Sequence, residues 1–195
     1  MLRVSVEVWR KLRSLAFGAV LVVMALSNVL LIKQNLEMRG ELHELKPRML
    51  EVGSKAETFV APGLRGELFS VNYTGKGPKR VFIYFSPGCP YCSTQFSYWV
   101  TLLNNLDRER FQVMGLVSES EDKSKVSEYL HGIGCDHLET AFVSNSVLRN
   151  YSLSITPTTL VVASDGRVEK AWPGVWDAGT LASARSLFGL SFESN

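Results

Sequence analysis

The chain has 195 residues, of which 46% are hydrophobic and 21% are charged, and its formal net charge at pH 7 is +2. This length suffices for one packed domain with an appendage, and the composition lacks the charge excess of a disordered protein. A charge so close to zero, without a dense stripe of Lys and Arg, excludes nucleic acid as an expected partner. The three cysteines are too few for a disulfide framework.

Residues 14–32 form an apolar segment of nineteen residues without a charge. That is close to the ~20 residues with which a helix crosses the hydrocarbon core of a bilayer. Four basic residues precede it within residues 1–13, whereas the stretch that follows carries basic and acidic residues together. The positive-inside rule then places residues 1–13 in the cytoplasm and exports the rest of the chain. We therefore expect a single-pass transmembrane anchor.

Two other interpretations of this segment are a cleaved signal peptide and a buried core helix. Ala25-Leu26-Ser27 is a passable small-x-small cleavage site. However, the apolar run continues beyond that site from Val29 to Ile32, which favours retention of the segment. The basic residues before it argue against burial in a core, so we favour the uncleaved anchor.

Residues 33–52 are polar and form a predicted linker or stalk. Apolar residues recur there at intervals of four and three, at Met38, Leu42, Leu45, Met49 and Val52. This heptad spacing is typical of a coiled coil, but it covers barely two heptads. Pro47 lacks an amide donor and would kink a helix in its second half. We expect a monomeric spacer that is part helix and part coil.

Residues 53–190 are predicted to form an α/β domain, which leaves 191–195 as a C-terminal tail. Short β-rich runs alternate there with helical stretches, as a sheet covered by helices requires. The residues at 80–85 are apolar on both faces, so that strand belongs at the centre of the sheet. Strands are predicted at 58–60, 67–72, 80–85, 111–117, 138–143, 158–163 and 167–171, and helices at 90–106, 122–132, 145–150 and 177–188.

Cys89-Pro90-Tyr91-Cys92 lies between the predicted central strand and the start of a helix. The first amides of a helix are unpaired and carry the positive end of the macrodipole, so a thiolate there is stabilised. The pKa of Cys89 is therefore expected below the ~8.5 of a free cysteine. The spacing of three lets Cys92 attack a mixed disulfide formed by Cys89. Pro90 suits the first helical turn because its missing amide hydrogen is unused there.

A Cys-x-x-Cys pair can also be half of a zinc site, which needs two further ligands. His131, Cys135 and His137 are the candidates, but their spacing is uneven and no second Cys-x-x-Cys is present. We interpret this segment as a solvated loop with a buried, inert Cys135, and we expect no metal.

A second marker is Thr156-Pro157, which directly precedes the apolar run at 158–163. Proline cannot donate to a β-ladder, so it is expected before the strand and not inside it. A cis peptide bond at this position would make a tight bend.

Together, the strand, the Cys89-Pro90-Tyr91-Cys92 helix start and Ile155-Thr156-Pro157-Thr158 resemble the thioredoxin superfamily. The resemblance covers about residues 53–190. The anchor, the β-rich segment before the central strand and the inserted strand-helix-strand favour its membrane-tethered TlpA/ResA-type, AhpC/TSA-redoxin-like branch. Trp172-Pro-Gly174 is similar to the W-x-G segment of that branch.

The resemblance implies a thioredoxin-like α/β fold, in which helices flank a central mixed sheet. It implies a protein thiol–disulfide oxidoreductase, with Cys89 as the nucleophile and Cys92 as the resolving thiol. Thr156 and Pro157, with Pro90 and Tyr91 beside the sulfurs, would contact the extended chain of a partner. Protein thiols or disulfides and a redox donor are the implied partners, and no cofactor is implied. The implied location is a bacterial inner membrane, with the catalytic domain in the periplasm.

Three residues depart from the family's pattern. Gly88 stands where many thioredoxins have Trp, and Ile83 stands where thioredoxin has a buried Asp. Gln95 stands where the TlpA/ResA branch often has Glu. No acidic residue is therefore evident as the proton acceptor of Cys92, and the direction of electron flow stays open.

Other functions are weighed against this one. Glutaredoxins share the C-P-Y-C motif, but the Gly-Gly that they carry after the cis-proline strand is absent here. Ser86-Pro-Gly-Cys89 resembles the T-P-G-C segment of a peroxiredoxin, so a peroxidase in which Cys89 is oxidised to a sulfenic acid is the alternative enzyme. A tethered binding module with a permanent Cys89–Cys92 disulfide is the third hypothesis.

Overall fold

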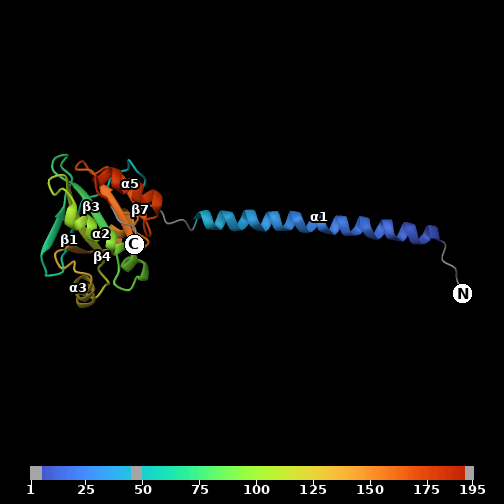
Figure 1. Ribbon diagram of the computed structural model, residues 1–195, viewed down its shortest axis with the longest axis horizontal. Helices are drawn as coiled ribbons and strands as arrows, with labels where there is room; N and C mark the ends of the chain where they lie inside the picture. The colour runs from blue at the N-terminus through green and yellow to red at the C-terminus, as the bar shows by residue number, and fades with distance from the viewer. Residues whose placement is uncertain (1–5, 45–49, 192–195) are drawn as a thin grey trace. The chain divides into compact units, whose positions relative to one another are not determined.

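The computed structural model describes residues 6–44 and 50–191. The chain divides into two compact units, Met1–Lys46 and Pro47–Asn195, which are described separately (Figure 1). The predicted kink at Pro47 and all but the first residue of the predicted C-terminal tail lie outside the described residues.

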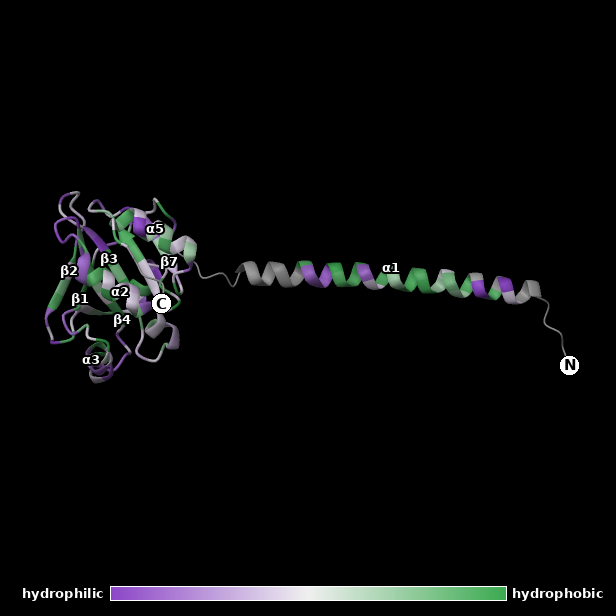
Figure 2. Cartoon of the chain, viewed as in Figure 1, coloured by the Kyte–Doolittle hydropathy of each residue, from purple (hydrophilic) through white to green (hydrophobic). Residues whose placement is uncertain are grey.

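The first unit consists of one helix, α1 (Val6–Glu44). Its segment Leu15–Leu36 is long and apolar enough to cross a membrane, a test that a signal sequence near the N-terminus also passes. Figure 2 shows the apolar stretch in the middle of the helix. This segment overlaps the predicted anchor at 14–32 and extends beyond it. The helix continues without a break to Glu44, so the first part of the predicted spacer is helical.

The second unit contains a five-stranded mixed sheet with the order β5-β4-β3-β6-β7. The central strand β3 (Lys79–Tyr84) pairs in parallel with β4 (Phe111–Ser118) and antiparallel with β6 (Thr158–Val162). The edge strands are β5 (Thr140–Val143) and β7 (Val168–Pro173). The predicted fold class is confirmed, and the doubly apolar run at 80–85 is central as predicted, since strands flank β3 on both sides.

The predicted hairpin before the central strand is also present. β1 (Phe59–Pro62) and β2 (Leu68–Val71) pair antiparallel and form a separate two-stranded sheet. The hairpin joins the edge of the main sheet through a bridge between Gly63 and Ala141.

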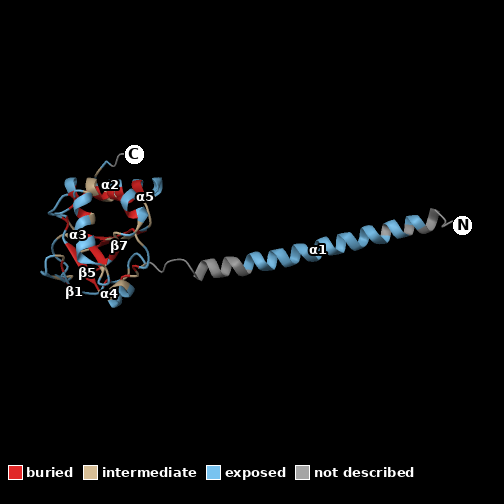
Figure 3. Cartoon of the chain, turned by 90° about the horizontal axis from the view of Figure 1, so that it is seen from below, coloured by how far each residue is buried: buried red, intermediate tan, exposed pale blue. Residues whose placement is uncertain are grey.

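Three helices lie over one face of the main sheet, namely α2 (Pro90–Asn105), α3 (Lys123–Gly132) and α5 (Ala178–Phe188). The short helix α4 (Asn145–Asn150) and the β1–β2 hairpin lie on the other face (Figure 3). Side chains at the helix starts define where the helices begin: Asp122 accepts from two amides of α3, and Asp177 accepts from the Thr180 amide in α5.

The alternation of side chains along β3 divides the core into two parts. Val81 and Ile83 are fully buried on the side of α2 and α5, where Phe96 and Trp99 pack. Phe82 is fully buried on the opposite side, against Tyr151 and the hairpin. The strand before the cysteines is thus enclosed on both faces, which gives Cys89 and Cys92 a rigid support.

Tyr151 stabilises the side of the sheet that faces away from the cysteines. Its hydroxyl donates to the backbone carbonyl of Glu57 and lies 2.7 Å from the hydroxyl of Tyr73. Tyr151→Phe leaves both partners with an unmet hydrogen bond, so we expect the free energy of unfolding to fall by about 1–3 kcal/mol. Denaturant unfolding of both proteins measures this change. An unchanged midpoint would show that water replaces the hydroxyl at no cost.

Candidate active site around Cys89 and Cys92

Cys89 lies in the tight turn that joins the central strand to α2. Its amide donates to the carbonyl of Ser86 at 3.1 Å, and the Gly88 amide donates to the Ser86 hydroxyl at 3.3 Å. Cys89 is the residue at the start of α2, and in its thiol form the side chain makes no capping hydrogen bond. Pro90 occupies the first turn of the helix, as predicted from its missing amide hydrogen. The positive end of the α2 dipole therefore lies at the Cys89 sulfur.

The electrostatics of Cys89 favour its thiolate. Burial alone raises the pKa of the thiol, but hydrogen bonds from the Thr156 hydroxyl, the Cys92 thiol and the amides of Cys92 and Tyr91 outweigh it, so the pKa is lowered from its ordinary value. Cys89 is also partly exposed. A partly exposed thiol with a lowered pKa has the properties of an attacking nucleophile.

Cys92 has the opposite character. It is fully buried, and burial is the main cause that raises the pKa of its thiol to about 12. A hydrogen bond from the Ser86 backbone lowers the pKa of Cys92 in part, whereas the hydrogen bond between the Cys92 and Cys89 side chains raises it. The two sulfurs are thus neighbours with opposite shifts. This asymmetry suits an exposed attacking thiol and an enclosed second thiol that reacts only after a partner is bound.

The loop before β6 brings Thr156 and Pro157 to the cysteines from 67 residues along the chain. The Thr156–Pro157 peptide bond is cis. The Cys89 thiol lies 3.4 Å from the carbonyl oxygen of Thr156, to which it donates. Trp99 on α2 donates from its indole to the hydroxyl of Thr159 at 3.0 Å, and this bond holds the start of β6 against the active-site helix.

The surface around Cys89 carries exposed apolar side chains. Tyr91 is 65% exposed and Ile155 is 36% exposed, one on each of the two segments that meet at the sulfur. Trp172 is 9% exposed instead, and its ring packs against Trp176 with a centroid distance of 5.4 Å. Trp172 is therefore a core residue and adds little to the exposed surface.

Gln95 has a role that sequence reasoning did not find, because the sequence marked it only as a departure from a family pattern. It is fully buried on α2, three residues after Cys92 and therefore on the same side of the helix. Its Oε1 accepts the backbone amide of Trp176 at 2.8 Å. Its Nε2 is buried without a hydrogen-bond partner in the described part of the chain. Gln95 thus ties the active-site helix to the loop after β7.

The lowered pKa of Cys89 has a measurable consequence for alkylation. The rate of carboxymethylation follows the thiolate, so we expect the rate at Cys89 to reach its plateau at a lower pH than that of a free thiol and to fall as the pH drops through the lowered pKa. Thr156→Val removes the hydroxyl that lowers the pKa and is expected to shift the profile to higher pH. A profile that matches free cysteine in the unsubstituted chain would contradict the assigned electrostatics.

The candidate zinc ligands His131 and Cys135 do not point to a common site. The His131 ring is exposed and lies 3.1 Å from the Asp136 carboxylate, whereas Cys135 is 1% exposed within the core. Burial raises the pKa of the Cys135 thiol, as expected for an inert residue. Among residues 6–44 and 50–191, no cluster of His, Cys, Asp and Glu is placed to hold a metal ion.

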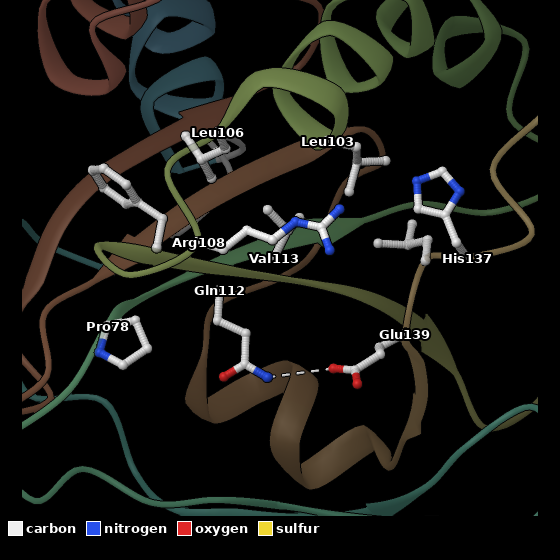
Figure 4. A pocket seen from close by; sticks show the side chains of 10 residues that line it. Pro78, Leu103, Leu106, Arg108, Gln112, Val113, His137 and Glu139 are labelled. Atoms are coloured by element: carbon white, nitrogen blue, oxygen red, sulfur yellow. Dashed lines mark hydrogen bonds between the residues drawn. The ribbon is translucent and has the colours of Figure 1, made fainter.

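A cavity of about 400 Å³ lies away from the cysteines, near the amino end of β4. Its floor is apolar, and Arg108, His137 and Glu139 stand around it (Figure 4). Gln112 donates from Nε2 to Glu139 at 3.3 Å. The residues that line this cavity include neither Cys89 nor Cys92, so it is separate from the candidate active site.

Comparison with known proteins assigns the chain to a family. Residues 52–171, more than half of the chain, match the AhpC/TSA family. The chain belongs to the AhpC/TSA family, which agrees with the predicted resemblance to the thioredoxin superfamily. At the level of the family, this supports an oxidoreductase role. No curated protein matches the chain.

Solved structures with the same fold include three thiol–disulfide proteins. The thioredoxin domain of a Bacteroides vulgatus thiol–disulfide oxidoreductase is 16% identical with a TM-score of 0.60, and the alignment covers 71% of this chain and 99% of that one. A thioredoxin-family thiol:disulfide interchange protein from Chlorobium tepidum is 18% identical with a TM-score of 0.57, covering 71% and 98%. A secreted Mycobacterium tuberculosis disulfide oxidoreductase, described as homologous to E. coli DsbE, is 16% identical with a TM-score of 0.53, covering 66% and 95%. At these identities the likeness shows the fold.

Proposed function

We propose that this protein is a thiol–disulfide oxidoreductase that exchanges disulfides with protein thiols through Cys89 and Cys92. The observation that carries the proposal is the asymmetry of the pair: a partly exposed thiol with a lowered pKa at a helix start, beside a buried thiol whose pKa is raised to about 12. Family membership and the fold support the same chemistry.

In the reductive direction, the Cys89 thiolate attacks a disulfide of the partner. A bond forms between Cys89 and one partner sulfur, and the other partner sulfur leaves as a thiolate and takes a proton from solvent. Cys92 then loses its proton and attacks the Cys89 sulfur, which releases the second partner thiolate and forms the Cys89–Cys92 disulfide. The reverse sequence oxidises the partner. The two electrons pass between the partner and the pair, so no cofactor takes part.

Thr156, Pro157, Pro90 and Tyr91 are the proposed contacts for the partner chain. The Thr156 carbonyl already lies against the Cys89 sulfur, at the point where an extended partner would bring its own sulfur. Exposed Tyr91 and Ile155 provide apolar surface on either side. These features suit an unfolded or extended segment better than a compact surface.

The test is reduction of a protein disulfide by the full chain in detergent micelles, with dithiothreitol as the electron source. The wild-type chain is expected to accelerate the reaction, whereas a Cys89→Ala, Cys92→Ala double variant should be no faster than dithiothreitol alone. Equal rates for the two chains would refute exchange. Addition of hydrogen peroxide in place of the disulfide tests the peroxidase alternative, in which peroxide oxidises Cys89 to a sulfenic acid and Cys92 or Cys135 condenses with it.

We also propose that α1 anchors the protein in a bacterial inner membrane, as in the membrane-tethered TlpA/ResA-type branch. Its apolar segment Leu15–Leu36 supports a single span. The basic residues before it support a cytoplasmic N-terminus and a periplasmic domain. Protease added to intact spheroplasts should then digest the domain, and protection of the domain would reverse this orientation. An N-terminus that begins near residue 28 in the mature protein would instead indicate a cleaved signal.

A further inference from the structure

The hydroxyl of Tyr129 is a buried polar group that has no part in the exchange reaction as described above. Tyr129 lies in the last turn of α3, and its hydroxyl is enclosed without a hydrogen-bond partner in the described part of the chain. Buried hydroxyls without partners are uncommon because the loss of hydration is not repaid. A second state of the site that supplies a partner would account for its retention.

The ring of Tyr129 is held between the two segments that position the cysteines. It stacks on Phe85 with a centroid distance of 5.9 Å and meets Phe96 edge to face at 5.6 Å. Phe85 directly precedes the turn that leads to Cys89, and Phe96 lies one turn beyond Cys92 on α2. These contacts hold the ring against two residues that lie close in sequence to Cys89 and Cys92.

The Tyr129 hydroxyl is a weaker acid than that of an exposed tyrosine. Burial raises the pKa of Tyr129, and the charges of Cys92, Cys89 and Cys135 raise it further. Tyr129 therefore keeps its proton throughout the working pH range and acts as a donor and not as a base. Tyr129 packs against the core cluster that contains Cys92. The Cys92 thiolate could accept a hydrogen bond from its hydroxyl.

We propose that the Tyr129 hydroxyl donates a hydrogen bond to the Cys92 thiolate that forms during resolution, and so acts as a positioning residue. This inference rests on the proposed function of Cys89 and Cys92. When Cys92 loses its proton to solvent, its anion attacks Cys89, the bond between Cys89 and the partner breaks, and the partner leaves as a thiolate. The tyrosine keeps its proton throughout and stabilises the buried anion before it attacks.

Cys92 is the sulfur that such a donor would help most, because burial keeps the pKa of its thiol raised although the Ser86 backbone and the Thr156 side chain lower it in part. Amides at the helix start and the Thr156 hydroxyl already stabilise the Cys89 thiolate. Several groups influence the pKa values of Cys92, Tyr129 and their titratable neighbours. They are Cys89, Cys92 and the Ser86 backbone near the start of α2, Thr156 before β6, Tyr84 on β3 with Glu121, and Cys135 with Asp136 after α3.

The experiment isolates the resolving step in the full chain in detergent micelles, in a Cys135→Ala background. Cys89 is loaded as a mixed disulfide with thionitrobenzoate, and the release of the coloured thiol by Cys92 is followed against pH. Tyr129→Phe is expected to slow this release about tenfold at every pH below the pKa of Cys92, because a hydrogen bond to a charged group is lost. The rate at which Cys89 is loaded should stay unchanged.

Tyr98→Phe is the matched control, because it removes the same atom from a tyrosine whose ring stacks on Trp176 on another side of α2. It should release at the wild-type rate. The melting temperature of Tyr129→Phe should equal or exceed that of wild type, since the variant loses a buried hydroxyl without a partner.

Three results would overturn the inference. Release by Tyr129→Phe within twofold of wild type would show that the hydroxyl is only structural. Slower loading with unchanged release would assign the hydroxyl to Cys89 instead. A wild-type chain that loads but never releases would overturn the proposed function as well, whereas the first two results leave that function standing.

Discussion

Cys92→Ala is expected to convert the protein into a covalent trap for its partners. Without the second thiol, the mixed disulfide at Cys89 cannot be resolved from within the chain, so adducts accumulate and turnover falls to the background rate. The adducts should appear as bands on a non-reducing gel that disappear with dithiothreitol. The effect is large because the substitution removes one of the two atoms between which the new bond forms.

Two matched variants give this prediction its controls. Cys89→Ala removes the partly exposed nucleophile and should yield no adduct, since the remaining Cys92 is fully buried. Cys135→Ala should turn over like wild type, because that thiol is buried and its pKa is raised. Adducts that form equally in Cys89→Ala would contradict the assignment of Cys89 as the attacking thiol.

Gln95→Glu is expected to give Cys92 a proton acceptor three residues further along α2. One carboxylate oxygen can keep the bond from the Trp176 amide, and the other would take the place of the buried Nε2 that has no partner. The release assay described for Tyr129 should show resolution up to ~10²-fold faster than wild type once the carboxyl is ionised. At lower pH the two rates should coincide.

Gln95→Glu is also expected to lower the free energy of unfolding as the pH rises. Gln95 is fully buried, so desolvation raises the pKa of a carboxyl there above the ~4.3 of an exposed Glu. The folded state then binds the proton more tightly than the unfolded chain. Stability should therefore be retained below the ordinary pKa and lost as the pH rises through the raised one. Denaturant unfolding at several pH values measures this loss.

Gln95→Leu separates the effect of a carboxyl group at position 95 from the effect of losing the Gln95 side chain. Leucine keeps most of the volume but accepts neither the Trp176 amide nor a proton, so we expect a loss of about 1–3 kcal/mol at every pH and no faster resolution. If Gln95→Glu releases its partner at the wild-type rate across the whole pH range, position 95 does not communicate with the Cys92 proton.

The parts of this site that lie close together in sequence could be predicted, and those that depend on tertiary packing could not. The apolar run before Cys89 predicted a central strand, and the Cys-Pro-Tyr-Cys sequence after it predicted a thiol at a helix start. Thr156 and Pro157 were predicted beside the sulfur only through a family resemblance. The structure places the Thr156 carbonyl 3.4 Å from the Cys89 sulfur.

Gln95 and Tyr129 show where sequence reasoning ends. Helical spacing predicts that Gln95 shares a side of α2 with Cys92, but its bond to Trp176 joins residues 81 positions apart. Tyr129 lies on a different helix from the cysteines, and a tyrosine in a mostly polar helix gives no sign that its hydroxyl is buried. Long-range packing of this kind has no local sequence pattern that would reveal it.

The equilibrium reduction potential of the Cys89/Cys92 couple tests the central claim most directly. The full chain with Cys135→Ala is titrated in detergent against glutathione or dithiothreitol, and the reduced fraction is counted by alkylation. We expect a reversible two-electron couple between about −120 and −270 mV, the range of known thiol oxidoreductases. The low end would favour a reductant and the high end an oxidant. A pair that never forms a disulfide, or one that cannot be reduced, would contradict the exchange mechanism.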